Sequence, residues 1–169
     1  MNSAKQKGDT YIMKGIKMRK IILLLILTGF VLAQNRNLTI SYSPGVIEFE
    51  EWDGEVDYNT IGIKYNVSPT SYSQWGGFYE LDTEEGEWNL LGCFMRSYLQ
   101  EDIFRPFLEV DAGLVMMESN NHFFVGGKIG GNYQLADNTL EIAFRYIFFE
   151  TDYQEYYITS AVLGYSIPI

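Results

Sequence analysis

The residue types that most often carry catalysis are scarce in this sequence. His122 is the only histidine, and Glu118 and Ser119 precede it in a short polar segment. A histidine base needs a nucleophile within hydrogen-bond reach and a third group that orients it. Nothing in this spacing marks the three residues as a preorganised set. We therefore interpret His122 as a loop residue and expect no catalytic residues.

Acidic residues gather in three polar segments, of which the first two could bind a hard cation such as Ca²⁺, through Glu48 to Asp57 or through Glu84, Glu85 and Glu87. They occupy residues 48–57, 82–87 and 150–155. Calcium takes six to eight oxygen ligands, but none of these segments has a spacing like that of an EF-hand loop. Because charged runs are usually solvated, we predict exposed loops with no bound metal or cofactor.

A different set of charged residues lies at alternating positions within apolar segments. It comprises Lys64, Arg96, Glu109, Asp111, Lys128, Glu141 and Arg145. In residues 140–149, for example, Phe144 and Tyr146 flank Arg145. The side chains of a strand point alternately to opposite faces, so we predict strands with one apolar and one charged face.

The same alternation predicts eight strands. They cover residues 38–43 with a resumption at 46–49, 58–67, 71–81, 88–99, 107–116, 122–135, 140–149 and 157–169. The first strand is predicted to break at Pro44-Gly45, and a tight turn is expected at Ala136-Asp137-Asn138. Connections after the second, fourth and sixth strands are short, and the others are more polar or acidic. We therefore predict an all-β fold, an eight-stranded antiparallel up-and-down transmembrane β-barrel.

The two faces of each strand indicate what would fill such a barrel. In a membrane barrel the apolar face contacts lipid and the charged face points into the lumen. An eight-stranded barrel is just wide enough for side chains to fill. We therefore predict that the seven charged residues form a lumen ion-pair network, with glycines such as Gly62 and Gly126 leaving room for them. The orientation of the third and fourth strands stays open around Gly76-Gly77.

Aromatic residues near the predicted strand ends are interpreted as girdles at the two membrane interfaces. They are Tyr58, Tyr72, Trp88, Tyr98, Tyr133, Tyr156, Tyr157 and Tyr165. The alternative interpretation is a soluble periplasmic or secreted barrel that binds a lipid or small apolar ligand in its lumen. Such a barrel would not place charges inside and apolar residues outside.

The N-terminal segment is typical of a cleaved secretory signal peptide. Arg19 and Lys20 precede the apolar run 21–33, which ends at Ala33 before Gln34. This run is too short for a membrane helix, which needs about 20 residues. We predict an upstream extension and signal peptide in residues 1–33 and a barrel domain in residues 34–169. Our hypothesis is that translation starts at Met13 or Met18 rather than at Met1.

Charge and cysteine content restrict the partners further. Of 22 acidic and 12 basic residues, one acidic and six basic residues precede Gln34, which leaves 21 and 6 for the rest. This excess of negative charge makes nucleic acid an improbable partner. Cys93 is the only cysteine, so no internal disulfide is possible.

Two segments carry a resemblance to a known family. RPFLEVDAGLV (105–115) and GGKIGGNYQLADNTLEIAFRYIF (126–148) resemble small outer-membrane barrels of the outer membrane protein A-like, porin-family type. The resemblance implies a location in the outer membrane of a Gram-negative cell envelope, and an even strand number places both termini in the periplasm. It implies contact with outer-membrane lipid and lipopolysaccharide. We expect a monomer without a periplasmic peptidoglycan-binding domain, because the sequence ends at its last strand.

The resemblance also implies how the chain would be inserted and what it would do. Leu163, Tyr165, Ile167 and Ile169 are similar to the C-terminal signal that the barrel-assembly machinery reads, with Ile169 in place of the usual phenylalanine. We expect a non-enzymatic protein with a filled lumen, acidic extracellular loops and a structural or surface-interaction role. Two alternatives remain open: a lipid-A-modifying enzyme that uses His122, and acidic loops that bind lipopolysaccharide through divalent cations.

Overall fold

The computed structural model describes residues 35–49, 55–83, 88–117, 120–151 and 154–169. The predicted signal peptide and its alternative start sites lie outside these ranges, as do Glu84, Glu85, Glu87, Glu118 and Ser119. Among the described residues, no helix is long and apolar enough to cross a membrane.

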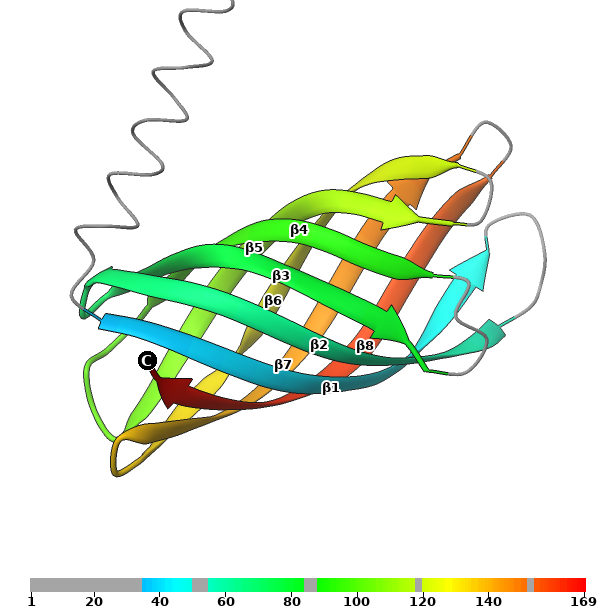
Figure 1. The fold of residues 1–169 in the computed structure, drawn as a ribbon. Helices are drawn as coiled ribbons and strands as arrows, with labels where there is room; N and C mark the ends of the chain where they lie inside the picture. Colours follow the sequence, from blue (N-terminus) through cyan, green and yellow to red (C-terminus); the bar gives the residue numbers. More distant parts are fainter. Residues whose placement is uncertain (1–34, 50–54, 84–87, 118–119, 152–153) are drawn as a thin grey trace, which may run out of the picture. The chain divides into compact units, whose positions relative to one another are not determined.

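The described residues form eight strands that close into one barrel (Figure 1). They are β1 (Asn35–Phe49), β2 (Glu55–Thr70), β3 (Ser73–Asp82), β4 (Asn89–Tyr98), β5 (Phe104–Met116), β6 (Asn121–Leu135), β7 (Asn138–Glu150) and β8 (Glu155–Pro168). Each strand pairs antiparallel with its neighbours in sequence, and β1 pairs antiparallel with β8. The start of β1 and the end of β8 therefore lie at the same end of the barrel, the terminus end (Figure 1).

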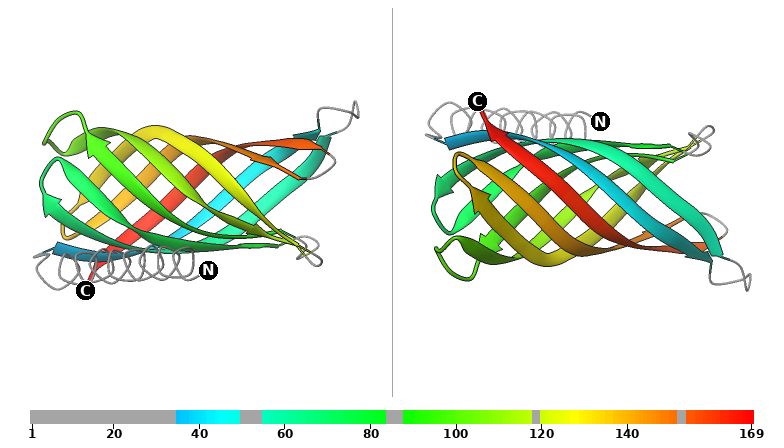
Figure 2. Two further views of the ribbon diagram at one scale, coloured as in Figure 1. Left: turned by 90° about the horizontal axis from the view of Figure 1, so that it is seen from above. Right: turned by 90° about the horizontal axis from the view of Figure 1, so that it is seen from below.

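The alternation in the sequence decides which side chains point outward. On β7, Ile142, Phe144 and Tyr146 are exposed, whereas Glu141 and Arg145 between and beside them are buried. The same period of two runs around the barrel, so the outer surface is apolar and the interior holds the charges. Seen from two further directions, the tilted strands enclose this interior on all sides (Figure 2).

The structure corrects the predicted break in the first strand. β1 continues through Pro44 and Gly45, which pair with Asn59 and Tyr58 of β2. Proline lacks a backbone N–H, and the pairs between β1 and β8 pass from Tyr42 directly to Gly45. The chain therefore loses ladder contacts on the β8 side of Pro44 and keeps them on the β2 side.

The connections differ from the prediction in length. β2 begins at Glu55, so Glu55 and Asp57 belong to a strand rather than to an acidic loop. The β6–β7 turn is the expected tight one, with Leu135 paired to Asn138 and Ala136 at a φ of 53°. The β4–β5 connection, residues 99–103, is longer than this turn.

The predicted aromatic girdles are wrong for four residues. Tyr58 and Tyr98 are buried in the interior, and Trp88 and Tyr156 pack against a buried apolar cluster. Tyr58, Tyr98 and Tyr156 lie on strands and Trp88 directly precedes β4, and all four rings pack inside the barrel instead of marking its outer rim. Tyr72, Tyr133 and Tyr165 are exposed, whereas Tyr157 is partly buried.

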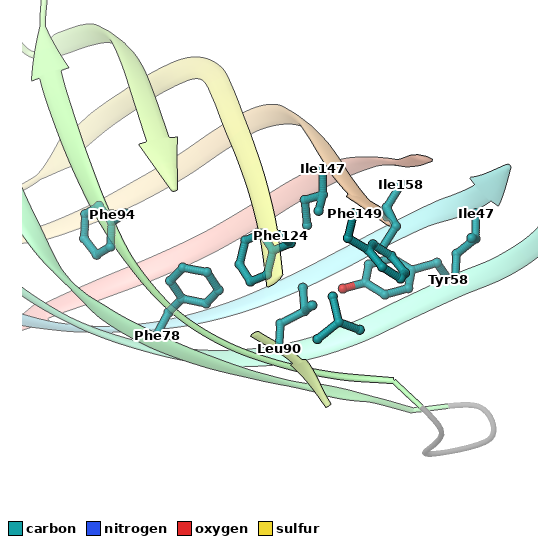
Figure 3. Close-up of a cluster of buried hydrophobic side chains, with 10 residues drawn as sticks. Ile47, Tyr58, Phe78, Leu90, Phe94, Phe124, Ile147, Phe149 and Ile158 are labelled. Carbon is teal, nitrogen blue, oxygen red and sulfur yellow. The ribbon is translucent and has the colours of Figure 1, made fainter. Parts of the chain in front are cut away.

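An apolar cluster fills the interior at the end opposite the termini, the loop end. It consists of Ile47, Tyr58, Phe78, Leu90, Phe94, Val115, Phe124, Ile147, Phe149 and Ile158, and we call it the apolar plug (Figure 3). Trp88, Phe149 and Tyr156 form its edge, with Phe149 stacked on Tyr156 at a centroid distance of 4.7 Å. The plug closes the lumen at this end.

Candidate functional site: a buried ion network and a polar cavity

The centre of the barrel holds charged side chains that meet around Glu109 of β5. One carboxylate oxygen of Glu109 lies 3.0 Å from Lys64 Nζ and 3.3 Å from Lys128 Nζ, and the other lies 2.6 Å from Arg96 Nη2. Arg96 Nη2 also lies 2.7 Å from Glu141 Oε2. Five residues from five different strands thus share one continuous set of ion pairs.

A second centre forms around Arg145 of β7. Its Nη1 lies 2.6 Å from Glu80 Oε2, and its Nη2 lies 2.7 Å from Asp111 Oδ2. Asp111 Oδ2 also accepts a hydrogen bond of 3.0 Å from Arg145 Nε. The two centres together make up the interior ion network: Lys64, Glu80, Arg96, Glu109, Asp111, Lys128, Glu141 and Arg145.

Glu80 is the member that the sequence analysis missed. Its strand was left without an assigned orientation because of Gly76-Gly77, yet Gln74, Gly76, Phe78 and Glu80 all face inward on β3. The signal was present, since Gln74, Phe78 and Glu80 share one parity while Tyr79 and Leu81 share the other. With Glu80, the network has four bases and four acids, so its formal charges cancel.

Small residues and aromatic rings shape the space around the network. A Cβ on Gly62 would lie 2.8 Å from Glu80 Cγ, and a Cβ on Gly126 would overlap Asp111 Oδ1. The Arg96 guanidinium carbon lies 3.7 Å from the centre of the Phe107 ring, and Lys64 Nζ lies 4.1 Å from that of Phe94. Cations over ring faces are favourable when they are shielded from water.

The network pairs its buried carboxylates with cations, although Asp111 Oδ1 has no hydrogen-bond partner among the described residues. Each of its four carboxylates lies within ion-pair distance of at least one cation. Burial of a charge is tolerable only when the charge is paired and hydrogen-bonded. Within the described ranges, no three His, Cys, Asp or Glu side chains are grouped as metal ligands.

A chain of hydrogen bonds leads from the network towards the terminus end. Arg96 Nη1 donates to Asn132 Oδ1, Asn132 Nδ2 donates to the Tyr98 hydroxyl, and that hydroxyl donates to Gln74 Oε1. Gln74 Nε2 then donates to Asn66 Oδ1, and Asn66 Nδ2 donates to Thr39 Oγ1, which is 2.6 Å from Ser166 Oγ. All these donors point the same way, and bonds arranged like this polarise one another. The chain links six of the eight strands.

Beyond this chain a polar cavity of about 430 Å³ occupies the terminus end. Gln74, Tyr98 and Asn132 of the hydrogen-bond chain line it together with Arg36 and Arg105. Glu101 and Asp137 also line it, and both are exposed. The barrel interior is thus apolar at the loop end, ionic in the middle and polar at the terminus end.

Of the remaining predicted residues, Ile169 lines the polar cavity, and the others lie away from the barrel interior. His122 was interpreted as a loop residue, but it is the second residue of β6, paired with Val115 of β5 and partly buried. Cys93 is exposed on the outer face of β4. Leu163, Tyr165 and Ile167 are exposed on β8, and Ile169 follows that strand, where its backbone N–H donates to the Arg36 carbonyl.

Comparison with known proteins identifies the fold. No protein-family model matches the chain, and no curated protein matches it significantly. The structure of neisserial surface protein A matches with a TM-score of 0.65 and 10% identity, over 78% of this chain and 96% of that one. The N-terminal β-barrel domain of OprF from Pseudomonas aeruginosa matches with a TM-score of 0.53 and 10% identity, over 79% and 100%.

A third match is the attachment invasion locus protein Ail of Yersinia pestis in complex with the heparin analogue sucrose octasulfate. Its TM-score is 0.50 at 10% identity, over 79% of this chain and 98% of that one. At such low identity these matches establish the fold alone. The predicted eight-stranded antiparallel up-and-down barrel is confirmed, as is the resemblance in fold to small outer-membrane barrels.

Proposed function

We propose that this chain is a non-enzymatic β-barrel of the outer membrane, with a filled lumen and a structural or surface-interaction role. It would cross the bilayer with its eight strands and present acidic segments at the loop end. Export through a signal peptide in residues 1–33 and insertion by the barrel-assembly machinery belong to the same proposal, as do contacts with outer-membrane lipid and lipopolysaccharide.

The observation that carries this proposal is the apolar outer surface of the barrel. Large hydrophobic side chains are exposed on every strand, among them Ile40, Ile61, Tyr79, Met95, Val110, Ile129, Phe144 and Leu163. Soluble monomers rarely expose contiguous apolar patches of more than a few hundred Å². Lipid tails would cover this apolar surface, whereas in water it would stay exposed to solvent.

The filled interior supports a role other than diffusion or carriage of an apolar ligand. The apolar plug closes the loop end, and the fully buried Arg96 and Arg145 occupy the centre. A soluble carrier of lipids would need an apolar cavity in the centre of the barrel, but ion pairs occupy that centre. A water-filled channel is equally disfavoured, since an eight-stranded barrel is filled by its own side chains.

Cell fractionation tests the proposal. The full-length chain is expressed in a Gram-negative host, and the membrane and periplasmic fractions are run on SDS gels with and without boiling. We expect the protein in the outer-membrane fraction, with a mobility that changes on boiling and an N-terminus at Gln34. Recovery in the periplasmic supernatant without a mobility change would favour the soluble barrel instead.

A pair of matched variants separates lipid contact from mere exposure. Phe144 lies midway along β7 and is 54% exposed, whereas Asp137 is exposed in the β6–β7 turn. An arginine at the bilayer midplane of a barrel costs about 2–4 kcal/mol. Phe144→Arg should therefore reduce the membrane-inserted form strongly and Asp137→Arg should not. On a soluble barrel both substitutions would be tolerated equally.

A further inference from the structure

Arg105 occupies a fixed position in the wall of the polar cavity. Its guanidinium carbon lies 3.9 Å from the centre of the Tyr98 ring, and its Nη2 donates to the Ser71 carbonyl. Tyr98 in turn is held by hydrogen bonds to Gln74 and Asn132. The guanidinium is therefore oriented before any ligand arrives, which lowers the entropic cost of binding one.

The hydrogen-bonding capacity of this guanidinium is mostly unused. Among the described residues, Arg105 donates through Nη2 alone, and its buried Nε has no partner. The described carboxylates also form no ion pair with it. Glu101 and Asp137 line the same cavity but are exposed to solvent. An oxygen ligand in the cavity would instead accept hydrogen bonds from Nη1, which donates to none of the described residues.

The distribution of charge singles out the same place. Residues 34–169 contain only six basic residues, of which Lys64, Arg96, Lys128 and Arg145 are consumed by the interior ion network. The other two, Arg36 and Arg105, both line the polar cavity. The acidic Glu101 and Asp137 line it as well, so Arg105 is the group in this wall that carries the argument.

We propose that the polar cavity binds a phosphate group, with Arg105 as its principal contact. The planar fork of a guanidinium matches the geometry of phosphate oxygens. The cavity of about 430 Å³ has room for roughly fourteen waters at about 30 Å³ each, so a solvated phosphate with a substituent fits. The group could belong to a free phosphate compound or to the head group of a phospholipid. The site would exist whether or not the barrel lies in a membrane.

A titration followed by NMR tests this proposal. The mature chain, refolded in a maltoside detergent without phosphate, is titrated with inorganic phosphate while the Nε–H signals of its arginines are recorded. We expect the Arg105 signal to shift and saturate in the millimolar range or below. Arg105→Gln should weaken binding about tenfold or more, since it removes charged hydrogen bonds. Arg105→Lys, which keeps the charge but loses the fork, should fall between.

Matched controls decide between the outcomes. Glu101→Gln changes another residue of the cavity wall and should bind phosphate at least as well as the native chain. Glycerophosphoglycerol, a soluble phospholipid head group, is titrated in parallel, and preferential binding of it would identify a lipid source. The proposal is overturned if the Arg105 signal of the native chain does not shift, or if Arg105→Gln binds with unchanged affinity. The absence of a shift in the native chain can be measured even if the variants do not fold.

Discussion

At the scale of single residues, the alternation of the sequence predicted which charges point inward but not which charges meet. Lys64 and Glu109 are 45 residues apart and lie on the non-adjacent strands β2 and β5. Their contact depends on the relative shift of every strand between them, which no local pattern encodes. Glu80 was missed because Gly76 and Gly77, earlier on the same strand, interrupt the alternation that marks a face.

Arg145 offers the sharpest residue-scale prediction. It is fully buried and is the cation that bonds both Glu80 and Asp111. Arg145→Met should cost about 3–5 kcal/mol of unfolding free energy, because it leaves two buried carboxylates without a counterion. Urea unfolding of the refolded barrel, followed by tryptophan fluorescence, measures this loss. Glu80→Gln should cost less, because Arg145 keeps Asp111.

The double variant Arg145→Met, Glu80→Gln completes the thermodynamic cycle. It should recover part of the loss of the single Arg145→Met variant, since one stranded carboxylate is neutralised. If the double variant loses more unfolding free energy than the two single variants lose together, this account of the network is contradicted.

At the scale of elements, strand positions were predictable because apolar residues alternate with polar or charged ones along each strand. The strand ends were not predictable. Glu55 and Asp57 have the composition of a loop, but they pair with β1 and so extend β2. Pro44 likewise reads as a break. β1 overrides it because the strand keeps its pairing with β2 on one side, and because Gly45 allows β8 to approach closely on the other.

Gly45 therefore decides whether the barrel closes. A Cβ there would overlap the Thr159 carbonyl oxygen and would lie 2.6 Å from Ser160 Cβ, both on β8. Gly45→Ala should sharply lower the fraction of protein that migrates as the folded band on unheated gels. Gly77→Ala is the matched control, since its Cβ would meet only the Gly92 oxygen at 3.5 Å. Equal folding of both variants would show that closure tolerates the added methyl group.

At the scale of the whole molecule, charge is segregated along the barrel axis. The six basic residues of 34–169 lie in the interior ion network or at the terminus-end cavity. The connections at the opposite end contain acidic residues and no basic ones in the sequence. The even strand count, which the sequence predicted, places the start of β1 and the end of β8 at the same end of the barrel. If the barrel spans the outer membrane as proposed, the loop end faces outward and the terminus end faces the periplasm.

Cysteine labelling on intact cells tests this orientation. Cys93, the single native cysteine, is first removed by Cys93→Ser. Glu150→Cys, at the end of β7, and Asp137→Cys, in the β6–β7 turn, then place one thiol at each end of the barrel. A membrane-impermeant maleimide should label the Glu150→Cys variant on intact cells, and the Asp137→Cys variant only after the outer membrane is permeabilised. The reverse pattern would show that the barrel has the opposite orientation. Labelling of both variants, or of neither, on intact cells would contradict a single transmembrane orientation.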